Sequence, residues 1–119
     1  MPIEPKDMVD FAYDCYKRAD DSKDTETSIR EVGFRCAIGR AYYGAFLIAR
    51  EAAGIPGTGK DDHKRVADHY LSIDGKIYQK LNSMRRLRNT SDYDIDETVS
   101  RREAMKCCSD AKDIANKLS

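Results

Sequence analysis

The chain has 119 residues and a mass of 13.5 kDa, a length that suits one domain with a single hydrophobic core. Its 21 basic and 21 acidic residues give a formal net charge of zero, which argues against a protein that binds nucleic acid through bulk charge. Apolar residues make up 40% of the chain and charged residues 35%, with three prolines and no tryptophan, as is typical of soluble helical proteins. We therefore predict one all-α domain over residues 1–119.

The first two predicted helices differ in how much of their surface is apolar. Pro5–Asp20 carries one apolar stripe at helical spacing, so we expect it to bury a single face. The second helix, from about Ser28 to Gly54, contains Cys36–Ala49, in which Arg40 is the only charge. A helix that is apolar on nearly all sides is normally enclosed by other helices. We predict that this helix is central and that its small residues let its neighbours approach closely.

Arg40 is the anomaly in this predicted interior. A buried guanidinium requires a carboxylate or several other acceptors. Two interpretations remain open: Arg40 forms a structural salt bridge, for which Asp92 or Asp94 is the expected partner, or it has a functional role.

The segment Gly54–Lys60 matches the spacing of a phosphate-binding P-loop, but we reject that function. Asp61 stands where a serine or threonine would bind magnesium, and the segment follows a helix instead of a strand. We expect a loop followed by a third, short helix over Asp61–Leu71. His63 and His69 fall on different faces of this helix, so a shared metal ion is not expected, and His63 is either a structural or a catalytic histidine.

The fourth helix is predicted over Gly75–Asn89, and its apolar stripe continues in register onto Arg88. Lys76–Thr90 contains five bases and no acid, so a local basic patch is expected despite the zero net charge. Arg86 falls on the opposite, solvent-facing side. A final helix should begin near Asp94 and run almost to the end of the chain, which completes a five-helix up-and-down bundle without strands.

No signal peptide, transit peptide or membrane-spanning run is evident, so we predict a cytoplasmic protein without a membrane partner. The cysteines lack the spacing of a disulfide framework or a zinc site. We expect four buried thiols: Cys15, Cys36, Cys107 and Cys108. Neither a metal nor another cofactor is expected.

The predicted turn after the fourth helix, Leu87–Asp94, is dense in polar side chains. In a structural interpretation, these side chains cap the two helix ends that meet there. In a functional interpretation, Arg88, Asn89 and Tyr93 converge on a phosphate and on its leaving or attacking oxygen.

Three segments of the chain resemble the HEPN domain family, an all-helical family found in toxin–antitoxin pairs, other prokaryotic defence systems and RNA-processing proteins. The segments are Arg40–Arg50, His63–Val66 and Leu87–Tyr93. Together with the helix pattern, the resemblance covers nearly the whole chain.

Active members of this family are metal-independent endoribonucleases with an arginine, a polar residue and, a few residues further on, a histidine. The resemblance assigns the first two roles to Arg88 and Asn89, but Tyr93 stands where the histidine is expected. A histidine with a pKa of about 6.5 exchanges protons near neutrality, whereas a tyrosine with a pKa of about 10 is a poor base there. We therefore expect weak or absent catalysis, with Tyr93 contacting a phosphate oxygen.

The resemblance also implies partners. The family usually dimerises so that two copies of the motif meet in one cleft, and the doubled basic run along its rim would bind RNA. One subgroup pairs with a nucleotidyltransferase antitoxin that in some systems adenylylates a tyrosine beside the motif, which makes Tyr93 the candidate acceptor. The expected binding residues are Arg40, His63, Lys80, Arg85 and Asp92.

Three functions follow from these observations. The first is an RNA-binding homodimer, acting as an endoribonuclease in a toxin–antitoxin or defence system. The second is a non-catalytic interaction module that binds a nucleotidyltransferase partner or a nucleotide through the same cleft. The third is a helical dimer without a ligand.

Overall fold

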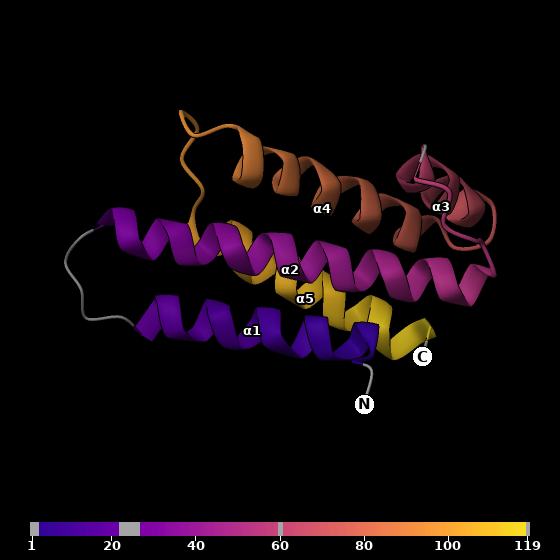
Figure 1. Cartoon of the computed structure of the whole chain (residues 1–119), viewed down its shortest axis with the longest axis horizontal. Helices are drawn as coiled ribbons and strands as arrows, with labels where there is room; N and C mark the ends of the chain where they lie inside the picture. The colour runs from indigo at the N-terminus through magenta and orange to yellow at the C-terminus, as the bar shows by residue number, and fades with distance from the viewer. Residues whose placement is uncertain (1–2, 22–26, 60, 119) are drawn as a thin grey trace.

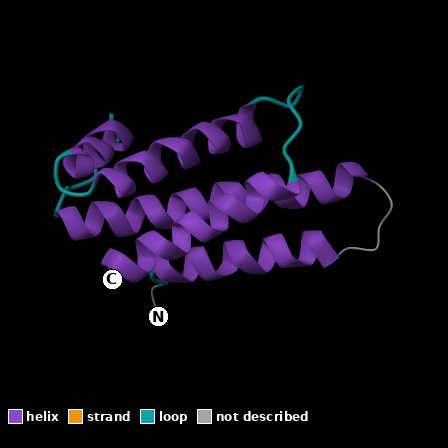
Figure 2. Ribbon diagram, turned by 180° about the vertical axis from the view of Figure 1, so that it is seen from behind, coloured by secondary structure: helices purple, strands orange, loops and turns teal. Residues whose placement is uncertain are grey.

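A computed structural model describes residues 3–21, 27–59 and 61–118, and the side chains of all of these except 27–29. Within these ranges the chain forms five helices and no strand, which confirms the predicted all-α class (Figure 2). None of the described helices is long and apolar enough to cross a bilayer. The helices are α1 (Pro5–Asp21), α2 (Thr27–Ala53), α3 (Asp62–Leu71), α4 (Gly75–Tyr93) and α5 (Arg101–Leu118).

The helix α2 lies at the centre of the bundle and packs against each of the other four helices (Figure 1). α1 and α4 lie on opposite sides of α2 and run in the opposite direction, α5 lies behind it, and the short α3 lies beside one end of α4. The prediction of a central second helix is therefore confirmed.

Small residues on α2 allow α1 to pack closely against it. A Cβ atom added at Gly44 would lie 2.9 Å from Val9 Cγ2 and 3.1 Å from the Pro5 carbonyl oxygen. One added at Gly33 would lie 2.7 Å from Ala19 Cβ. Neither glycine leaves enough space for an added methyl group, so the distance between α1 and α2 depends on Gly33 and Gly44.

The prediction that Arg40 is buried is wrong. Arg40 is exposed, and it forms no ion pair with any carboxylate that the structure describes. The reason is geometric: α1, α4 and α5 surround α2 on three sides and leave one stripe of it uncovered. Val32 and Tyr43, which are 59% and 50% exposed, lie on this open stripe with Arg40.

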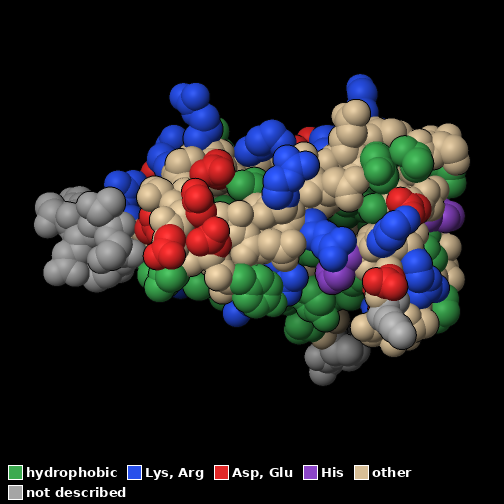
Figure 3. Space-filling view, turned by 90° about the horizontal axis from the view of Figure 1, so that it is seen from above, with side chains coloured by type: hydrophobic (Ala, Val, Ile, Leu, Met, Phe, Trp, Pro, Cys, Tyr) green, Lys and Arg blue, Asp and Glu red, His purple; other side chains and the backbone are tan. Residues whose placement is uncertain are grey.

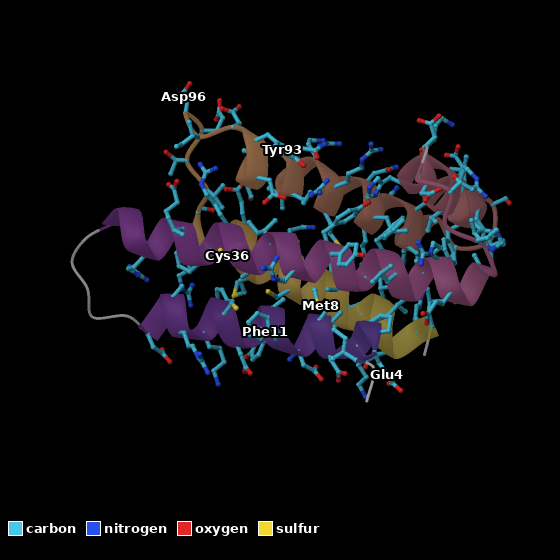
Figure 4. The ribbon with its side chains drawn as sticks, in the orientation of Figure 1. Glu4, Met8, Phe11, Cys36, Tyr93 and Asp96 are labelled. Carbon is cyan, nitrogen blue, oxygen red and sulfur yellow. The ribbon has the colours of Figure 1, made fainter. Side chains whose placement is uncertain are left out.

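The expectation of four buried thiols is also wrong for two of the four cysteines. Cys36 lies on the open stripe of α2 and is exposed, and Cys15 is half-buried (Figure 4). Cys107 and Cys108 are buried as expected, and burial raises the pKa of both thiols. The last two are therefore poorly reactive side chains of the core.

The arginine of α2 that binds the segment after α4 is Arg35. Its Nη1 donates to the carbonyl oxygens of Thr90, Ser91 and Asp94 at 3.1, 3.0 and 3.1 Å. Its Nη2 donates to the Glu97 carbonyl oxygen, and its Nε donates to the Glu31 carboxylate at 3.0 Å. This one guanidinium therefore ties α2 to the end of α4 and to the connection that follows.

The boundary between the last two helices differs from the prediction. α4 continues through Tyr93 instead of ending at Asn89, and α5 begins at Arg101 instead of Asp94. Asp94 is the C-cap of α4. Its N–H still donates to the Thr90 carbonyl oxygen, but its own backbone is no longer helical.

A capping box formed by Ser100 and Glu103 starts α5. The Glu103 N–H donates to Ser100 Oγ at 3.1 Å, and the Ser100 N–H donates back to the Glu103 carboxylate at 3.0 Å. This pair satisfies two backbone N–H groups that a helix start would otherwise leave unpaired.

Replacing Arg35 by alanine should lower the free energy of unfolding by about 2–4 kcal/mol, because it leaves several carbonyl oxygens of one connection without their charged donor. The matched control is Arg40→Ala on the same helix, which should change stability by no more than about 0.5 kcal/mol because Arg40 is exposed and forms no ion pair with a described carboxylate. Chemical denaturation followed by circular dichroism measures both. A larger loss for Arg40→Ala than for Arg35→Ala would contradict this assignment.

Candidate functional site

A cavity of about 530 Å³ opens between α2, α4 and the start of α3. One wall is the exposed stripe of α2 and the other is the last two turns of α4. The loop before α3 closes one end. The lining residues are Val32, Arg35, Cys36, Gly39, Arg40, Tyr42, Tyr43, Phe46, Gly59, Asp61, Asp62, His63, Arg88, Ser91 and Asp92.

Arg88 enters this cavity from α4 in a fixed orientation. Its Nε donates to Asp92 Oδ2 at 3.0 Å, one helical turn further along α4. The carboxylate lies against Gly39 of α2, where an added Cβ atom would be 3.4 Å from Asp92 Oδ1, an ordinary contact distance. Neither η nitrogen of Arg88 hydrogen-bonds to a residue that the structure describes, so both remain available to a ligand.

Tyr42 and His63 form a hydrogen-bonded pair at the end of the cavity near α3. The Tyr42 hydroxyl lies 2.6 Å from His63 Nδ1, and the imidazole packs on the Phe46 ring at a centroid distance of 4.6 Å. Burial raises the pKa of Tyr42 to about 12, so its hydroxyl stays protonated at neutral pH.

The pKa of His63 is shifted in the opposite direction. Burial of the ring and the positive charges of Arg85 and Arg88 lower this pKa, against a smaller opposing effect of Asp62. His63 is therefore neutral at pH 7.

The Asp62 carboxylate, at the edge of the cavity, is ionised and surrounded by hydrogen-bond donors. Its carboxylate accepts hydrogen bonds from the Thr58 hydroxyl, from the N–H groups of Thr58 and Gly59, and from Arg65 Nη1. These donors hold the pKa of Asp62 at about 2. They also fix the loop that precedes α3, which positions His63 at the edge of the cavity.

The Ser91 side chain is an unsatisfied polar group in the cavity wall. Ser91 is 6% exposed, and its hydroxyl has no hydrogen-bond partner among the described residues. Buried hydroxyl groups are normally paired, so this one is a candidate partner for a water molecule or a polar ligand.

The cavity brings together half of the residues that the sequence singles out. Arg40, His63, Arg88 and Asp92 come from three different helices and line the same cavity. Arg85 does not line it, but its charge acts on both Tyr42 and His63.

The other predicted residues lie elsewhere. Tyr93 is 74% exposed and borders a second hollow next to the first, although its ring centroid lies 5.5 Å from the Arg88 guanidinium carbon (Figure 4). Asn89 is exposed and does not line the cavity. Lys80 donates to Asp113 of α5 at 3.0 Å and lines a separate, lysine-rich hollow.

Sequence reasoning missed Tyr42 and Ser91 as residues of the site. Tyr42 follows Arg40 by two positions, so it falls on the buried side of α2 and reads as part of the core. Ser91 follows the apolar stripe of α4 in register after Arg88, and this spacing was the signal that could have placed it.

The loop Gly54–Lys60 is a connection between two helices, as predicted, with Lys60 outside the described residues.

Comparison of the chain with family models, with curated proteins and with solved structures gives no match. No group of three or more metal-binding side chains is found within the part of the chain that the structure describes. The fold and the site therefore define a five-helix protein with an arginine- and histidine-lined cavity.

The pKa of His63 should lie below the usual value of about 6.5, and Arg88→Gln should raise it, because the substitution removes a nearby positive charge. A lowered pKa means that the unfolded chain binds this proton more readily than the folded chain does. The neutral His63 ring therefore adds to the free energy of unfolding above about pH 6.5, and this addition is lost as the pH falls through the folded-state pKa. NMR titration of the imidazole measures the shift. Arg86→Gln, on the solvent-facing side of α4, is the control and should leave the titration unchanged.

Proposed function

We propose that this chain is a HEPN-type protein that binds single-stranded RNA, with one phosphate of the strand held in the cavity by Arg88. The observation that supports this function best is the state of the Arg88 guanidinium. Asp92 fixes its Nε and leaves both η nitrogens free inside a cavity that Arg40 and His63 also line. An arginine oriented in this way suits bidentate binding of phosphate oxygens.

Three arginines and three carboxylates line the cavity, so its preference for an anion depends on which of these charges are already paired. Of the carboxylates, Asp92 is paired with Arg88 and Asp62 is surrounded by donors, while Asp61 lies in the wall at the start of α3. Arg40 is not neutralised by any described carboxylate. In the surface view, Lys and Arg side chains are spread along the face that α4 occupies, and most of the visible Asp and Glu side chains lie towards one end, with others near the opposite end (Figure 3). The zero net charge therefore does not describe this face.

Cleavage of RNA is the second part of the proposal. In a metal-independent endoribonuclease, Arg88 would stabilise the charge that develops on the phosphate, Asn89 would orient it, and Tyr93 would contact an oxygen. The position of Tyr93 makes the last role demanding, since its ring borders the neighbouring hollow and is largely exposed.

The same exposure favours the second candidate function, a non-catalytic module that binds a nucleotidyltransferase partner or a nucleotide. A tyrosine that is 74% exposed at the end of a helix is accessible to a modifying enzyme. In a toxin–antitoxin or defence system, Tyr93 would then be the acceptor of a nucleotidyl group.

Arg88→Gln should weaken the binding of a labelled single-stranded RNA by roughly tenfold or more, because a charge-assisted contact to phosphate is lost. Arg86→Gln, two residues away on the exposed side of α4, should change affinity by less than about threefold. Fluorescence anisotropy without added metal measures both variants. Equal affinities for wild type and Arg88→Gln would refute the assignment of the site.

Cleavage of the same RNA separates the two candidate functions. If wild type cleaves the RNA and Tyr93→Phe does not, the tyrosine hydroxyl is catalytic. If wild type does not cleave the RNA but Tyr93→His does, the cleft lacks only a group that titrates near neutrality. If both are inert and Arg88→Gln weakens binding, the interaction module is the better description.

We also infer that the chain forms a homodimer across the second hollow, which has a volume of about 560 Å³. Three apolar side chains around this hollow are strongly exposed: Val32, Tyr93 and Ile95, at 59%, 74% and 89%. Contiguous exposed apolar surface of this kind is typical of protein contacts. Such an interface would place the two Arg88 side chains in one composite cleft.

Ile95→Asp should convert a dimer to a monomer at micromolar concentration, because it places a charge in the apolar contact. The matched control is Ile73→Asp, since Ile73 is also an exposed isoleucine, at 67%, in a different connection. Light scattering after size-exclusion chromatography gives the mass of each variant. A monomeric wild type would contradict the dimer.

A further inference from the structure

The hydrogen bond between Tyr42 and His63 determines which imidazole nitrogen carries a proton. Tyr42 is 3% exposed, and its hydroxyl makes no other hydrogen bond with a described residue. If His63 Nδ1–H donated to this oxygen, the hydroxyl hydrogen would be buried without an acceptor, which is unfavourable. The hydroxyl therefore donates to Nδ1, and the neutral ring carries its proton on Nε2.

This arrangement differs from that of a histidine that removes protons. In a catalytic triad a carboxylate accepts from Nδ1–H, which leaves the lone pair of Nε2 free to act as a base. Here the partner of Nδ1 is a phenol that stays protonated, and the nearest acid in the chain, Asp62, directs its oxygens to Thr58, Gly59 and Arg65. At neutral pH, His63 therefore presents an N–H donor.

The charged groups around His63 keep the ring neutral until an anion is present. Tyr42 faces it from α2, Arg85 and Arg88 act on it from α4, and Asp62 precedes it in the chain. The two arginine charges oppose a proton on the ring, and an anion bound between them and the ring would offset that effect.

Two atoms indicate that the cavity takes a polar ligand at this place. His63 Nε2 has no hydrogen-bond partner among the described residues, and the Ser91 hydroxyl in the opposite wall is buried and unpaired. Both residues line the same cavity as Arg88. A phosphate group that Arg88 binds has further acceptor oxygens, one of which can accept from His63 Nε2–H.

We propose that His63 binds a phosphate through Nε2–H and that Tyr42 is the positioning residue that sets its tautomer, so that His63 holds the RNA and does not take the proton of an attacking hydroxyl. This assignment rests on the proposed function. It has a thermodynamic consequence. A bound anion lowers the cost of the imidazolium form, in which the Tyr42 hydroxyl must turn to accept from Nδ1–H, so binding raises the pKa of His63 and tightens as the pH falls towards that pKa.

Nitrogen-15 NMR of the full chain at pH 7 reads the tautomer directly. We expect a protonated Nε2 and an unprotonated Nδ1 for His63 in wild type, and loss of this single tautomer in Tyr42→Phe. Titration with inorganic phosphate should raise the pKa of His63. A ring protonated on Nδ1, or a pKa that phosphate leaves unchanged, would overturn the proposal.

Two substitutions of His63 then separate a donor from a base in the RNA-binding assay. His63→Gln keeps an N–H donor that cannot titrate, so at pH 7 its affinity should stay within about threefold of wild type, without the increase at lower pH. His63→Phe keeps the ring contact with Phe46 but has no donor, and should bind roughly tenfold more weakly or worse. Thermal unfolding checks that both variants fold.

The outcomes distinguish this inference from the proposed function. RNA binding that depends on Arg88 but is unaffected in His63→Phe would overturn the inference alone. A wild type that does not bind RNA, but whose His63 pKa rises with phosphate, would refute the proposed function and support the phosphate assignment. Normal RNA affinity in His63→Gln together with complete loss of cleavage would identify His63 as a base and overturn the inference.

Discussion

The packing of α2 against the other four helices is the constraint on which the rest of the structure depends. Glycines at the α1 contact set one distance, the Tyr70 hydroxyl bonded to the Ala49 carbonyl oxygen ties α3 to α2, and Arg35 ties α2 to the end of α4. These contacts hold α3 and α4 on one side of α2 at fixed positions. The cavity is the space that remains between them, so most of its wall belongs to packed helices, and the loop before α3 closes one end.

The fold was largely predictable from the sequence because it depends on apolar periodicity. α2 stands out through its long uncharged segment, and the other helices through their stripes. The boundary between α4 and α5 was not predictable. The polar residues at 87–94 suit a turn, and they equally suit the last turns of a helix whose carbonyl oxygens accept from Arg35 of α2. The capping box of Ser100 and Glu103 was present in the sequence, but Asp94 offered the same spacing to Glu97.

The site was predictable only in part, because sequence spacing gives the face of a helix but not what covers it. Arg40 lies within an apolar segment and nevertheless faces solvent, since no helix covers that stripe of α2. Arg88 continues the apolar stripe of α4 in register and lies in the wall of the cavity. Tyr42 could not be recognised, because its role depends on a histidine 21 residues further along the chain that reaches it only in the folded state.

The nature of the group that faces a histidine decides what the histidine can do. A carboxylate on Nδ1 raises the basicity of the ring and frees Nε2 to accept a proton. A buried phenol does the reverse, because it donates to Nδ1 and leaves the proton on Nε2. Burial and the charges of Arg85 and Arg88 also oppose protonation of the ring, so at neutral pH the imidazole offers a donor and not a base. A site built in this way is suited to holding an anion, and any proton transfer from the bound strand would require an acceptor other than this imidazole.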